Sequence, residues 1–461
     1  MTDDQITTGE EDLAERLALR RVNSLTTELS DVSEVEYRQL RLERVVLVGL
    51  WQGGSAADAA GAMAELAALA DTAGSVVVDE LVQRRDQPDP ATYVGSGKVD
   101  EIKAAVAANG ADTVICDGEL SPAQLRNLED RLGVKVVDRT ALILDIFAQH
   151  AKSVEGKTQV ELAQLNYLKQ RLRGWGDSLS RQVGGRAAGG VGIGGRGPGE
   201  TKIETDRRRI NTRVAVLRKR LKTMATTREL SRADRRRNQV PAVAIVGYTN
   251  AGKSSLLNRL TDAGVMVEDA LFATLDPTTR RARSADGRVY TLTDTVGFVR
   301  HLPTDLVEAF KSTLEETRQA DLLVHVVDGA DADPLGQVAA VRAVLAQIQA
   351  AGVPELMVVN KTDIAPGDAL ATLRHALPGA LFVSAVTGEG LDELRAAIEA
   401  RLPCPGIKVE ALVPWARGDL LDKAHRNGEV LETEVTPDGT RLVACVHENL
   451  AAELAPYAVN K

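Results

Sequence analysis

The chain has 461 residues, of which 44% are hydrophobic and 26% are charged, and its net charge is −9. This composition is ordinary for a soluble globular protein, and the length predicts about two to four domains. No apolar run approaches the ~20 residues of a membrane span, and the acidic start does not resemble a signal peptide. The three cysteines, Cys116, Cys404 and Cys445, lack paired or metal-type spacing, which predicts thiols in a reducing cytoplasm.

The N-terminal part of the sequence predicts a leader followed by a small domain. Residues 1–43 are acidic and have little apolar periodicity, so we expect a flexible leader. In residues 44–149, short apolar runs alternate with helical patterns, which predicts an N-terminal parallel α/β domain. The predicted strands are 45–48, 75–78, 113–116 and 134–137, and the predicted helices are 56–69, 99–108 and 122–132.

Tyr93-Val-Gly-Ser-Gly-Lys98 lies within this domain and permits two interpretations. Its glycines and lysine resemble a nucleotide-binding loop, but the spacing is not that of a phosphate loop. A tight turn before a helix explains the segment at least as well. Whether this domain binds a second nucleotide such as ATP is therefore left open.

Residues 150–240 predict an antiparallel helical hairpin with a glycine-rich tip. Leucines at 162, 165, 168 and 172 mark one helix, and apolar residues at 210, 214, 217, 221 and 224 follow a heptad spacing on the other. Between the two helices lies Gly184–Gly199, which holds nine glycines and two arginines and cannot form a core.

The second predicted helix of the hairpin is strongly basic. From Thr201 to Val240 there are fourteen Lys and Arg residues against four Asp and Glu residues, a local charge of +10 in an acidic chain. Arg171, Arg173 and Trp175 add charge and an aromatic ring on the other arm. A solvated helix face is the usual reason for such a run, but this excess has a single sign and adjoins the glycine-rich tip. We therefore predict binding to folded RNA.

A phosphate-binding loop follows in residues 241–403, which we predict to be a GTPase domain with a doubly wound sheet. The motif follows the apolar run 243–246 and precedes a helical pattern, the context that a G-x-x-x-x-G-K-S/T loop requires. Its backbone N–H groups would face phosphates, Lys253 would reach the β- and γ-phosphates, and Ser254 would meet Mg²⁺. The predicted loop residues are Gly247, Tyr248, Thr249, Asn250, Ala251, Gly252, Lys253, Ser254 and Ser255.

Three further motifs, each at the end of a predicted strand, indicate GTP as the nucleotide. Asp294-Thr-Val-Gly297 would hold the hydration shell of the metal and touch the γ-phosphate. In Asn360-Lys361-Thr-Asp363, the carboxylate can accept hydrogen bonds from guanine N1–H and the exocyclic amine, which adenine cannot supply. In Ser384-Ala385-Val386, the amide of Ala385 can meet guanine O6.

The GTPase domain is expected to contain helices at 305–316 and 391–402, and Pro403-Cys-Pro405 predicts its end. Residues 404–461 carry alternating segments at 408–412, 430–435 and 441–446, which predict a small C-terminal α+β domain. The four domains together place the chain in the multidomain α/β class.

Several segments together resemble the HflX family of bacterial ribosome-associated GTPases, which belong to the class of translation factors. The resemblance covers the chain from about Val45 to the end of the GTPase domain, and it is looser in the leader and the last sixty or so residues. It is carried by Tyr93–Lys98, by the helix 156–172, by the glycine-rich tip, by Phe272–Arg280 and by Asp294–Pro303.

The resemblance implies a function and a partner. Members of the family bind the large ribosomal subunit (50S), insert the glycine-rich loop near the peptidyl-transferase centre of 23S rRNA, and split stalled or idle 70S ribosomes. The chain is then expected to be a cytoplasmic monomer, partly bound to ribosomes, with GTP or GDP and Mg²⁺ as ligands. The family pattern also assigns Thr274 as the switch threonine that meets Mg²⁺ and the γ-phosphate, although from the sequence alone Thr278 or Thr279 would serve equally.

The catalytic mechanism is less fully specified by the sequence. Lys253, Thr274 and Gly297 are the predicted catalytic residues, but Phe298 stands where related GTPases carry a glutamine that orients water, so unaided turnover is expected at or below ~10⁻³ to 10⁻² s⁻¹. Alternatively, Phe298 simply packs against the switch. Asn250 resembles a potassium ligand of some GTPases and can equally cap the loop.

Two other functions remain open at this stage. The GTPase domain could regulate RNA processing or modification, or assembly of the 50S subunit. No Cys/His/Glu constellation suited to RNA chemistry occurs, and His150 and His301 are isolated. The chain could also act as a binding module that needs nucleotide but not turnover, which the sequence does not distinguish from the first hypothesis.

Overall fold

The computed structural model describes residues 44–183, 198–237, 240–261, 271–272, 274–284, 288–300, 311–403, 407–446 and 448–459. The predicted leader and residues 184–197 of the predicted glycine-rich tip lie outside these ranges. The chain forms two compact units, and the division falls between Lys222 and Thr223. Each unit is described by itself. In the described part of the chain, no helix is long and apolar enough to cross a membrane.

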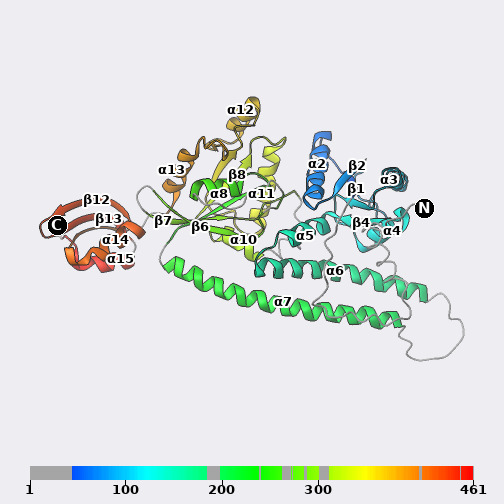
Figure 1. Cartoon of the computed structure of the whole chain (residues 1–461), viewed down its shortest axis with the longest axis horizontal. Coiled ribbons are helices and arrows are strands. Elements are labelled where there is room, and N and C mark those ends of the chain that lie inside the picture. Colours follow the sequence, from blue (N-terminus) through cyan, green and yellow to red (C-terminus); the bar gives the residue numbers. More distant parts are fainter. Residues whose placement is uncertain are drawn as a thin grey trace, which may run out of the picture. The chain divides into compact units, whose positions relative to one another are not determined.

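The N-terminal part of the first unit is a four-stranded parallel sheet with the strand order β2-β1-β3-β4, which confirms the predicted α/β fold (Figure 1). Hydrophobic side chains such as Val46, Ile115 and Leu128 are buried on its strands and helices. The strands are β1 (Arg44–Trp51), β2 (Val76–Arg84), β3 (Thr113–Cys116) and β4 (Lys135–Asp138), and the helices are α2 (Ala56–Thr72), α3 (Ser96–Asn109) and α4 (Pro122–Leu132).

A further helix, α5 (Arg139–His150), follows β4 and was not predicted from the sequence. Its residues Leu142–Phe147 are all buried, so the helix lacks the polar stripe that reveals a surface helix. The isolated His150 lies at its end and contacts the carbonyl oxygen of Ile146 at 2.9 Å, a contact within the helix.

The segment Tyr93–Lys98 forms a turn that leads into α3. Tyr93 has a φ of +66° and is buried, and its hydroxyl donates a hydrogen bond to the carbonyl oxygen of Asp117. The Gly95 amide donates to the side chain of Gln83 at 2.8 Å, and Lys98 pairs with Glu101. These contacts agree with the tight-turn interpretation, and a second nucleotide site stays a prediction.

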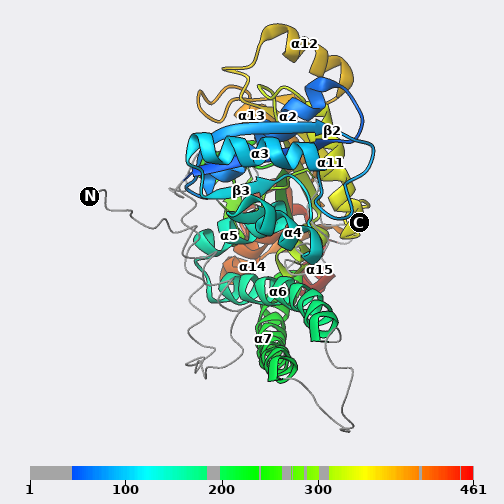
Figure 2. The same ribbon diagram turned by 90° about the vertical axis from the view of Figure 1, so that its right-hand side faces the viewer.

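Two long helices, α6 (Val154–Val183) and α7 (Pro198–Arg237), form the predicted antiparallel hairpin and lie side by side in Figures 1 and 2. Their apolar seam packs Leu162 and Leu165 against Val214 and Leu217, with Ile210 and Leu221 at the sides of the seam. An ion pair at 2.6 Å between Arg213 and Glu161 joins the helices beside the seam. The heptad spacing thus predicted the helix pairing.

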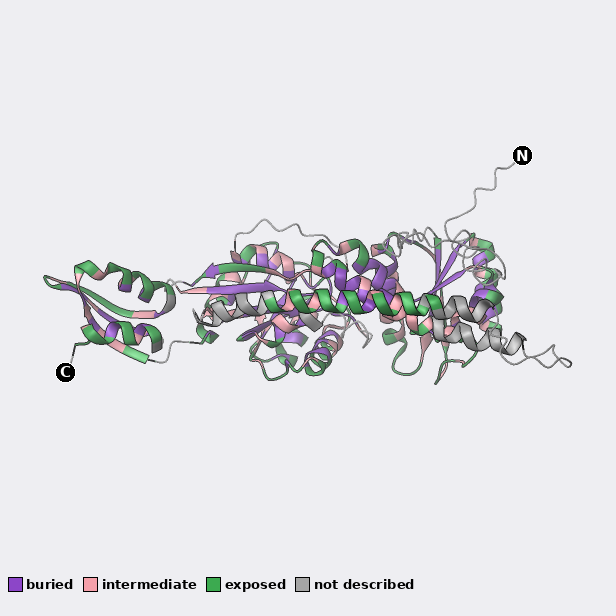
Figure 3. Cartoon of the chain, turned by 90° about the horizontal axis from the view of Figure 1, so that it is seen from below, coloured by how far each residue is buried: buried purple, intermediate pink, exposed green. Residues whose placement is uncertain are grey.

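The second unit contains a six-stranded sheet with the order β10-β9-β8-β5-β7-β6, in which only β6 is antiparallel to its neighbour. In Figure 3 most of the strand residues near the middle of this sheet are buried. The strands are β5 (Ala242–Gly247), β6 (Thr278–Arg283), β7 (Val289–Asp294), β8 (Leu322–Asp328), β9 (Glu355–Asn360) and β10 (Leu381–Phe382).

Helices cover this sheet as the doubly wound architecture requires. Leucines of α8 and α13, including Leu256 and Leu394, share one hydrophobic cluster with the central strands. The first predicted helix of this domain, 305–316, overlaps α10, and its residues 305–310 lie outside the described ranges. The helices are α8 (Lys253–Thr261), α10 (Lys311–Arg318), α11 (Pro334–Gln347), α12 (Gly367–Ala376) and α13 (Leu391–Arg401).

The C-terminal segment is a three-stranded antiparallel sheet, ordered β11-β13-β12, with helices packed on one face, and it confirms the predicted α+β fold. Its own core includes Ala411, Leu420, Leu442 and Leu450. The elements are β11 (Ile407–Val413), a 3₁₀ turn (Trp415–Arg417), α14 (Gly418–Asn427), β12 (Glu429–Thr436), β13 (Gly439–Val446), α15 (Glu448–Leu454) and a 3₁₀ turn (Ala455–Tyr457).

The seam of the hairpin gives a stability prediction. Leu217 is 1% exposed, so Leu217→Ala removes buried methyl groups and leaves a cavity that costs about 2–4 kcal/mol. We expect the opening free energy of the α6 and α7 amides, measured by hydrogen exchange, to fall by that amount while amides of β8 keep theirs. The exposed neighbour Val216→Ala is the control, and an equal effect of both substitutions would contradict the packing.

Candidate nucleotide-binding site

The loop between β5 and α8 has the backbone conformation that a phosphate loop needs. Gly252 has a φ of +89°, and a Cβ there would lie 2.2 Å from the side-chain nitrogen of Asn360. At Gly247, a Cβ would lie 2.3 Å from the carbonyl oxygen of Val326. Asn250 has a φ of +58°, a left-handed conformation that asparagine tolerates better than most side chains. The sequence Gly-x-x-x-x-Gly is thus required by close packing as well as by turn geometry.

Lys253 is the most electrostatically perturbed group of this loop. Its side chain is buried, and its Nζ donates a hydrogen bond to the carbonyl oxygen of Tyr248 at 2.7 Å. Burial lowers the pKa of Lys253 to about 8, and the negative charge of Asp294 opposes part of this shift. An anionic phosphate in the loop would restore the preference of this amine for its charged form.

Two hydroxyls and one carboxylate gather beside Lys253. The Ser254 hydroxyl donates to Oδ2 of Asp294 at 2.6 Å, and Thr274 Oγ1 lies 3.2 Å from the same oxygen and 2.9 Å from Ser254 Oγ. These are the three residues predicted to bind Mg²⁺ or its hydration shell. Burial raises the pKa of Asp294, against the opposing effect of Lys253 and of the two hydroxyls.

The donor set of this cluster fits a small divalent cation. The second carboxylate oxygen of Asp294, Oδ1, is buried and has no hydrogen-bond partner among the described residues. Mg²⁺ prefers oxygen ligands and keeps several waters, so two hydroxyls with a buried carboxylate behind them suit it. No cluster of three His, Cys, Asp or Glu side chains that could hold a metal occurs within the described ranges.

The segment after Asp294 runs directly against the phosphate loop. A Cβ at Gly297 would lie 2.9 Å from the Cα of Thr249 and 3.0 Å from Nζ of Lys253. The Thr249 amide donates to the Phe298 carbonyl at 2.8 Å, and the Phe298 amide donates to the Gly247 carbonyl at 3.1 Å. The ring of Phe298 is 1% exposed, so this residue packs between the switch and the loop.

Tyr248 and Asp333 also hold the segment after Asp294, through two contacts with Arg300. Neither contact was predicted from the sequence. The Arg300 amide donates to the Tyr248 hydroxyl at 2.7 Å, and the Arg300 guanidinium pairs with Asp333 at the same distance. Asp333 in turn caps α11 by accepting from the Gly336 amide. No signal in the sequence indicated the two contacts of Arg300, because each joins residues more than thirty positions apart.

Asn360 connects the phosphate loop to the predicted guanine site. Its side-chain nitrogen donates to the carbonyl oxygen of Ala251 at 2.9 Å, and its oxygen accepts from the Ala385 amide at 3.0 Å. The Ala385 amide is therefore engaged here by Asn360, and its contact with guanine O6 stays a prediction. Arg259 of α8, which the sequence analysis missed, donates to the carbonyl oxygens of Ala385 and Val386.

The predicted specificity residues lie together at the ends of β9 and β10. Asp363 is exposed, and its Oδ1 accepts a hydrogen bond from the Ser384 hydroxyl at 2.6 Å. Lys361 has a φ of +63° and pairs with Asp328 at 2.7 Å. The oriented carboxylate of Asp363 leaves its second oxygen available to the N–H groups of a guanine base.

Three matches to protein families cover the chain in order. They are described as "GTP-binding GTPase N-terminal" (residues 60–148), "GTP-binding GTPase Middle Region" (150–235) and "50S ribosome-binding GTPase" (242–361). "GTPase HflX" of Lacrimispora saccharolytica is 46% identical over 94% of this chain and 99% of its own length. "GTPase HflX" of Escherichia coli strain K12 is 48% identical over 82% of this chain and 87% of its own length.

The chain belongs to the HflX GTPase family. It is a GTPase that converts GTP to GDP and phosphate, and GTP and GDP are its nucleotides. Among solved structures, a GTP-binding protein from Sulfolobus solfataricus in complex with GDP is 25% identical to this chain. The match covers 78% of this chain and 98% of that protein, with a TM-score of 0.39.

The perturbed lysine predicts a proton linkage in this HflX-family chain. Above pH 8 the free Lys253 is mostly neutral, and bound phosphate favours its charged form, so GDP binding at pH 8.5–9 should take up protons. At pH 7 the lysine is already charged and this uptake should vanish. Calorimetry in two buffers with different ionisation enthalpies measures the uptake.

Lys253→Arg is the matched control for this linkage, because arginine stays charged throughout this range. The variant should bind GDP without the uptake at pH 8.5–9. Equal uptake by the variant and the unchanged chain would assign the proton to another group and contradict the interpretation.

The orientation of Asp363 predicts a change of base specificity. Asp363→Asn replaces one acceptor oxygen by an N–H₂ donor, which opposes the N–H groups of guanine but suits the C2 carbonyl of xanthine. We expect affinity for GDP to fall by about 100-fold or more, and affinity for xanthosine diphosphate to rise, by fluorescence titration. Asp368→Asn, on exposed α12, is the control, and unchanged GDP affinity in Asp363→Asn would refute the assignment.

Proposed function

We propose that the chain is a GTP-switched factor that binds the 50S ribosomal subunit and dissociates stalled or idle 70S ribosomes. The observation that carries this proposal is the presence, in one chain, of a GTPase domain and a basic helical hairpin. The family match described as a 50S ribosome-binding GTPase and the HflX relatives support the ribosome as partner. The finer contact, insertion of the loop Gly184–Gly199 near 23S rRNA, follows from the family resemblance.

The basic residues of α7 are arranged as an RNA-binding surface requires. Arg207–Arg209 and Arg218–Arg220 are two exposed basic triplets separated by eleven residues, which is three helical turns or about 16 Å. They therefore repeat on the same sides of the helix. Arg207 and Arg218 have no carboxylate partner among the described residues, unlike Arg213, which pairs with Glu161. Two such arginines, one in each triplet, can bind phosphates of a nucleic-acid backbone.

The nucleotide would control this binding through the switch segments. We infer that Ser254 and Thr274 bind Mg²⁺ and that Asp294 holds its hydration shell, while Lys253 and the Gly297 amide face the γ-phosphate. Loss of that phosphate would release the segments around Thr274 and Gly297. The Mg²⁺ would neutralise charge that develops on the phosphates during transfer to water.

Positioning of the attacking water is not assigned to a side chain of the switch. The ring of Phe298 is buried and cannot hydrogen-bond water, so unaided hydrolysis should be slow. We propose that binding to the 50S subunit orders the catalytic site so that the attacking water is positioned. The alternatives, a GTPase that regulates RNA processing, RNA modification or 50S assembly, would use the same nucleotide site and differ in their effect on 70S ribosomes.

Steady-state GTP hydrolysis with purified subunits tests the proposal. We expect 50S subunits to raise the rate by about ten-fold or more, well within the ~10⁵-fold that partners of GTPases achieve, and 30S subunits to leave it unchanged. Light scattering of 70S ribosomes should then fall on addition of the chain with a GTP analogue. Stimulation of hydrolysis without loss of 70S particles would favour the assembly or processing role instead.

A potassium role for Asn250 is a second, separate proposal. Asn250 has a left-handed backbone conformation in the phosphate loop, so its side-chain oxygen could bind K⁺ there or merely cap the loop. If K⁺ binds, hydrolysis should be about five-fold or more faster in KCl than in NaCl at equal ionic strength, and Asn250→Ala should lose the difference. Equal rates in both salts would leave the capping role.

A further inference from the structure

The outer edge of the GTPase sheet is formed by β6, which pairs with a strand on only one side among the residues that the structure describes. The ladder between β6 and β7 runs without irregularity, from Thr278 opposite Asp294 to Arg283 opposite Val289. Just beyond it, the Ser284 amide donates to the Arg288 carbonyl at 2.9 Å, which continues the same register. In an antiparallel ladder, hydrogen-bonded pairs alternate with pairs whose N–H and C=O groups point away.

This alternation identifies the groups that point outward. The hydrogen-bonded positions include 282, 280 and 278, so the N–H and C=O groups of Thr279, Arg281 and Arg283 face away from β7. No backbone hydrogen bond from these three residues occurs among the residues that the structure describes. The edge therefore offers three donors and three acceptors at the spacing of a β-strand, which is a template for another strand.

The same strand carries a concentrated positive charge. Its sequence, Thr-Thr-Arg-Arg-Ala-Arg, contains three exposed arginines and no acidic residue in a chain of net charge −9. Arg281 and Arg283 lie on one face, opposite Thr291 and Val289, so the neighbouring strand supplies no carboxylate to them. Within the described ranges neither arginine has an ion-pair partner, whereas the arginine on the adjacent helix, Arg395, pairs with Asp392.

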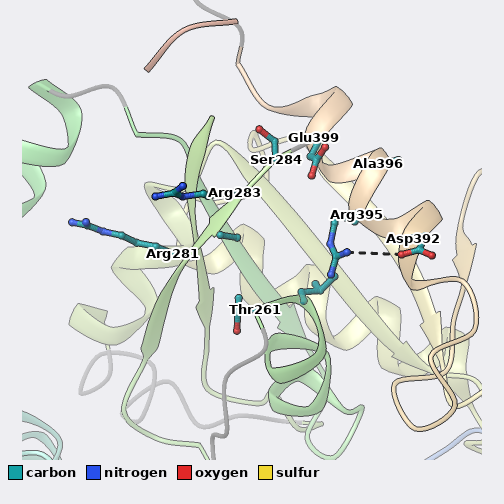
Figure 4. Close-up of a pocket in the computed structure, with 10 residues that line it drawn as sticks. Thr261, Arg281, Arg283, Ser284, Asp392, Arg395, Ala396 and Glu399 are labelled. Carbon is teal, nitrogen blue, oxygen red and sulfur yellow. Dashed lines mark ion pairs between the residues drawn. The ribbon is translucent and has the colours of Figure 1, made fainter. Parts of the chain in front are cut away.

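A groove of about 550 Å³ lies beside this edge, between β6, the end of α8 and α13. In Figure 4 the side chains of Arg281 and Arg283 extend away from α13. Arg395, Asp392 and Glu399 belong to α13 itself. Thr261 forms another part of the lining. Arg281 and Arg283 also form part of the lining, so a strand laid along β6 would run beside both the two arginines and the groove.

We propose that β6 binds an extended acidic segment of a protein partner by strand addition. The occupant follows from the chemistry of the edge. Phosphates of RNA would satisfy the arginines and the N–H groups, but they have no donors for the outward carbonyl oxygens of Thr279, Arg281 and Arg283. A polypeptide backbone supplies both donors and acceptors, and carboxylates at alternate positions pair with the two guanidinium groups.

The location of β6 links this surface to the nucleotide. Thr278, at the start of the strand, lies opposite Asp294, and the Thr279 hydroxyl contacts the Thr293 hydroxyl at 3.0 Å. A strand bound on β6 would therefore extend the sheet one strand beyond the pair that contains Asp294, the carboxylate that holds Ser254 and Thr274. The docking site is formed by other residues than those of the hairpin, and its test needs no ribosome.

The test uses the full chain loaded with a GTP analogue and a labelled peptide, acetyl-Thr-Glu-Val-Glu-Val-Glu-Thr-amide, followed by fluorescence anisotropy. We expect saturable binding with a dissociation constant below about 1 mM. Arg281→Glu combined with Arg283→Glu should weaken it by about ten-fold or more. Arg280→Glu, an equal charge change on the opposite face of the same strand, is the matched control and should weaken it less than about three-fold.

Backbone methylation of the peptide distinguishes strand addition from charge attraction. One peptide carries N-methyl groups on its glutamates and a second carries them on its valines, so each blocks the donors of one edge only. Strand addition predicts a loss of about ten-fold or more for only one of the two peptides. Equal binding of both, absence of saturable binding, or tighter binding of a uridine hexanucleotide that displaces the peptide would each overturn the proposal.

Discussion

The buried carboxylate of Asp294 is the interaction on which the arrangement of the GTPase site depends. It holds hydroxyls from two other segments, Ser254 of the phosphate loop and Thr274 before β6, and its charge faces the buried amine of Lys253. Removing a carboxylate from water raises the free energy of its charged form. Added positive charge and hydrogen-bond donors therefore stabilise the site. In the function that we propose, a nucleotide with its Mg²⁺ would supply the positive charge and the phosphates that suit this constellation.

The same region explains how a small change at the γ-phosphate can be transmitted. Gly297 and Phe298 run against the phosphate loop through backbone hydrogen bonds, and Arg300 joins this segment to Tyr248 and to Asp333 at the start of α11. Thr274 bonds directly to Asp294, and β6, which follows Thr274 in the chain, pairs with the strand that ends at Asp294. Because these contacts are discrete hydrogen bonds rather than loose packing, the segment has a defined bound position that a phosphate can favour or exclude.

Much of this architecture could be predicted because its signals are local. The phosphate loop, the strands that precede each motif and the heptad seam of the hairpin depend on residues that are close in sequence. The helix α5 was missed because Leu142–Phe147 are buried on all sides and show no polar stripe. The Asn360 bridge, the Arg259 contacts and the Tyr248–Arg300 bond were missed because their partners are separated by 25 or more positions. The outward edge of β6 becomes visible only from the strand register.

We propose that the γ-phosphate, sensed at Ser254, Thr274 and Asp294, controls binding of the chain to the large ribosomal subunit. The most direct measurement is the affinity for purified 50S subunits with a GTP analogue and with GDP, for the unchanged chain and for Thr274→Ala. The account predicts about ten-fold or tighter binding with the analogue, and loss of that difference in Thr274→Ala with GDP affinity of the chain preserved. Equal 50S affinity in the two nucleotide states of the unchanged chain, or a difference that survives in the variant, would contradict it.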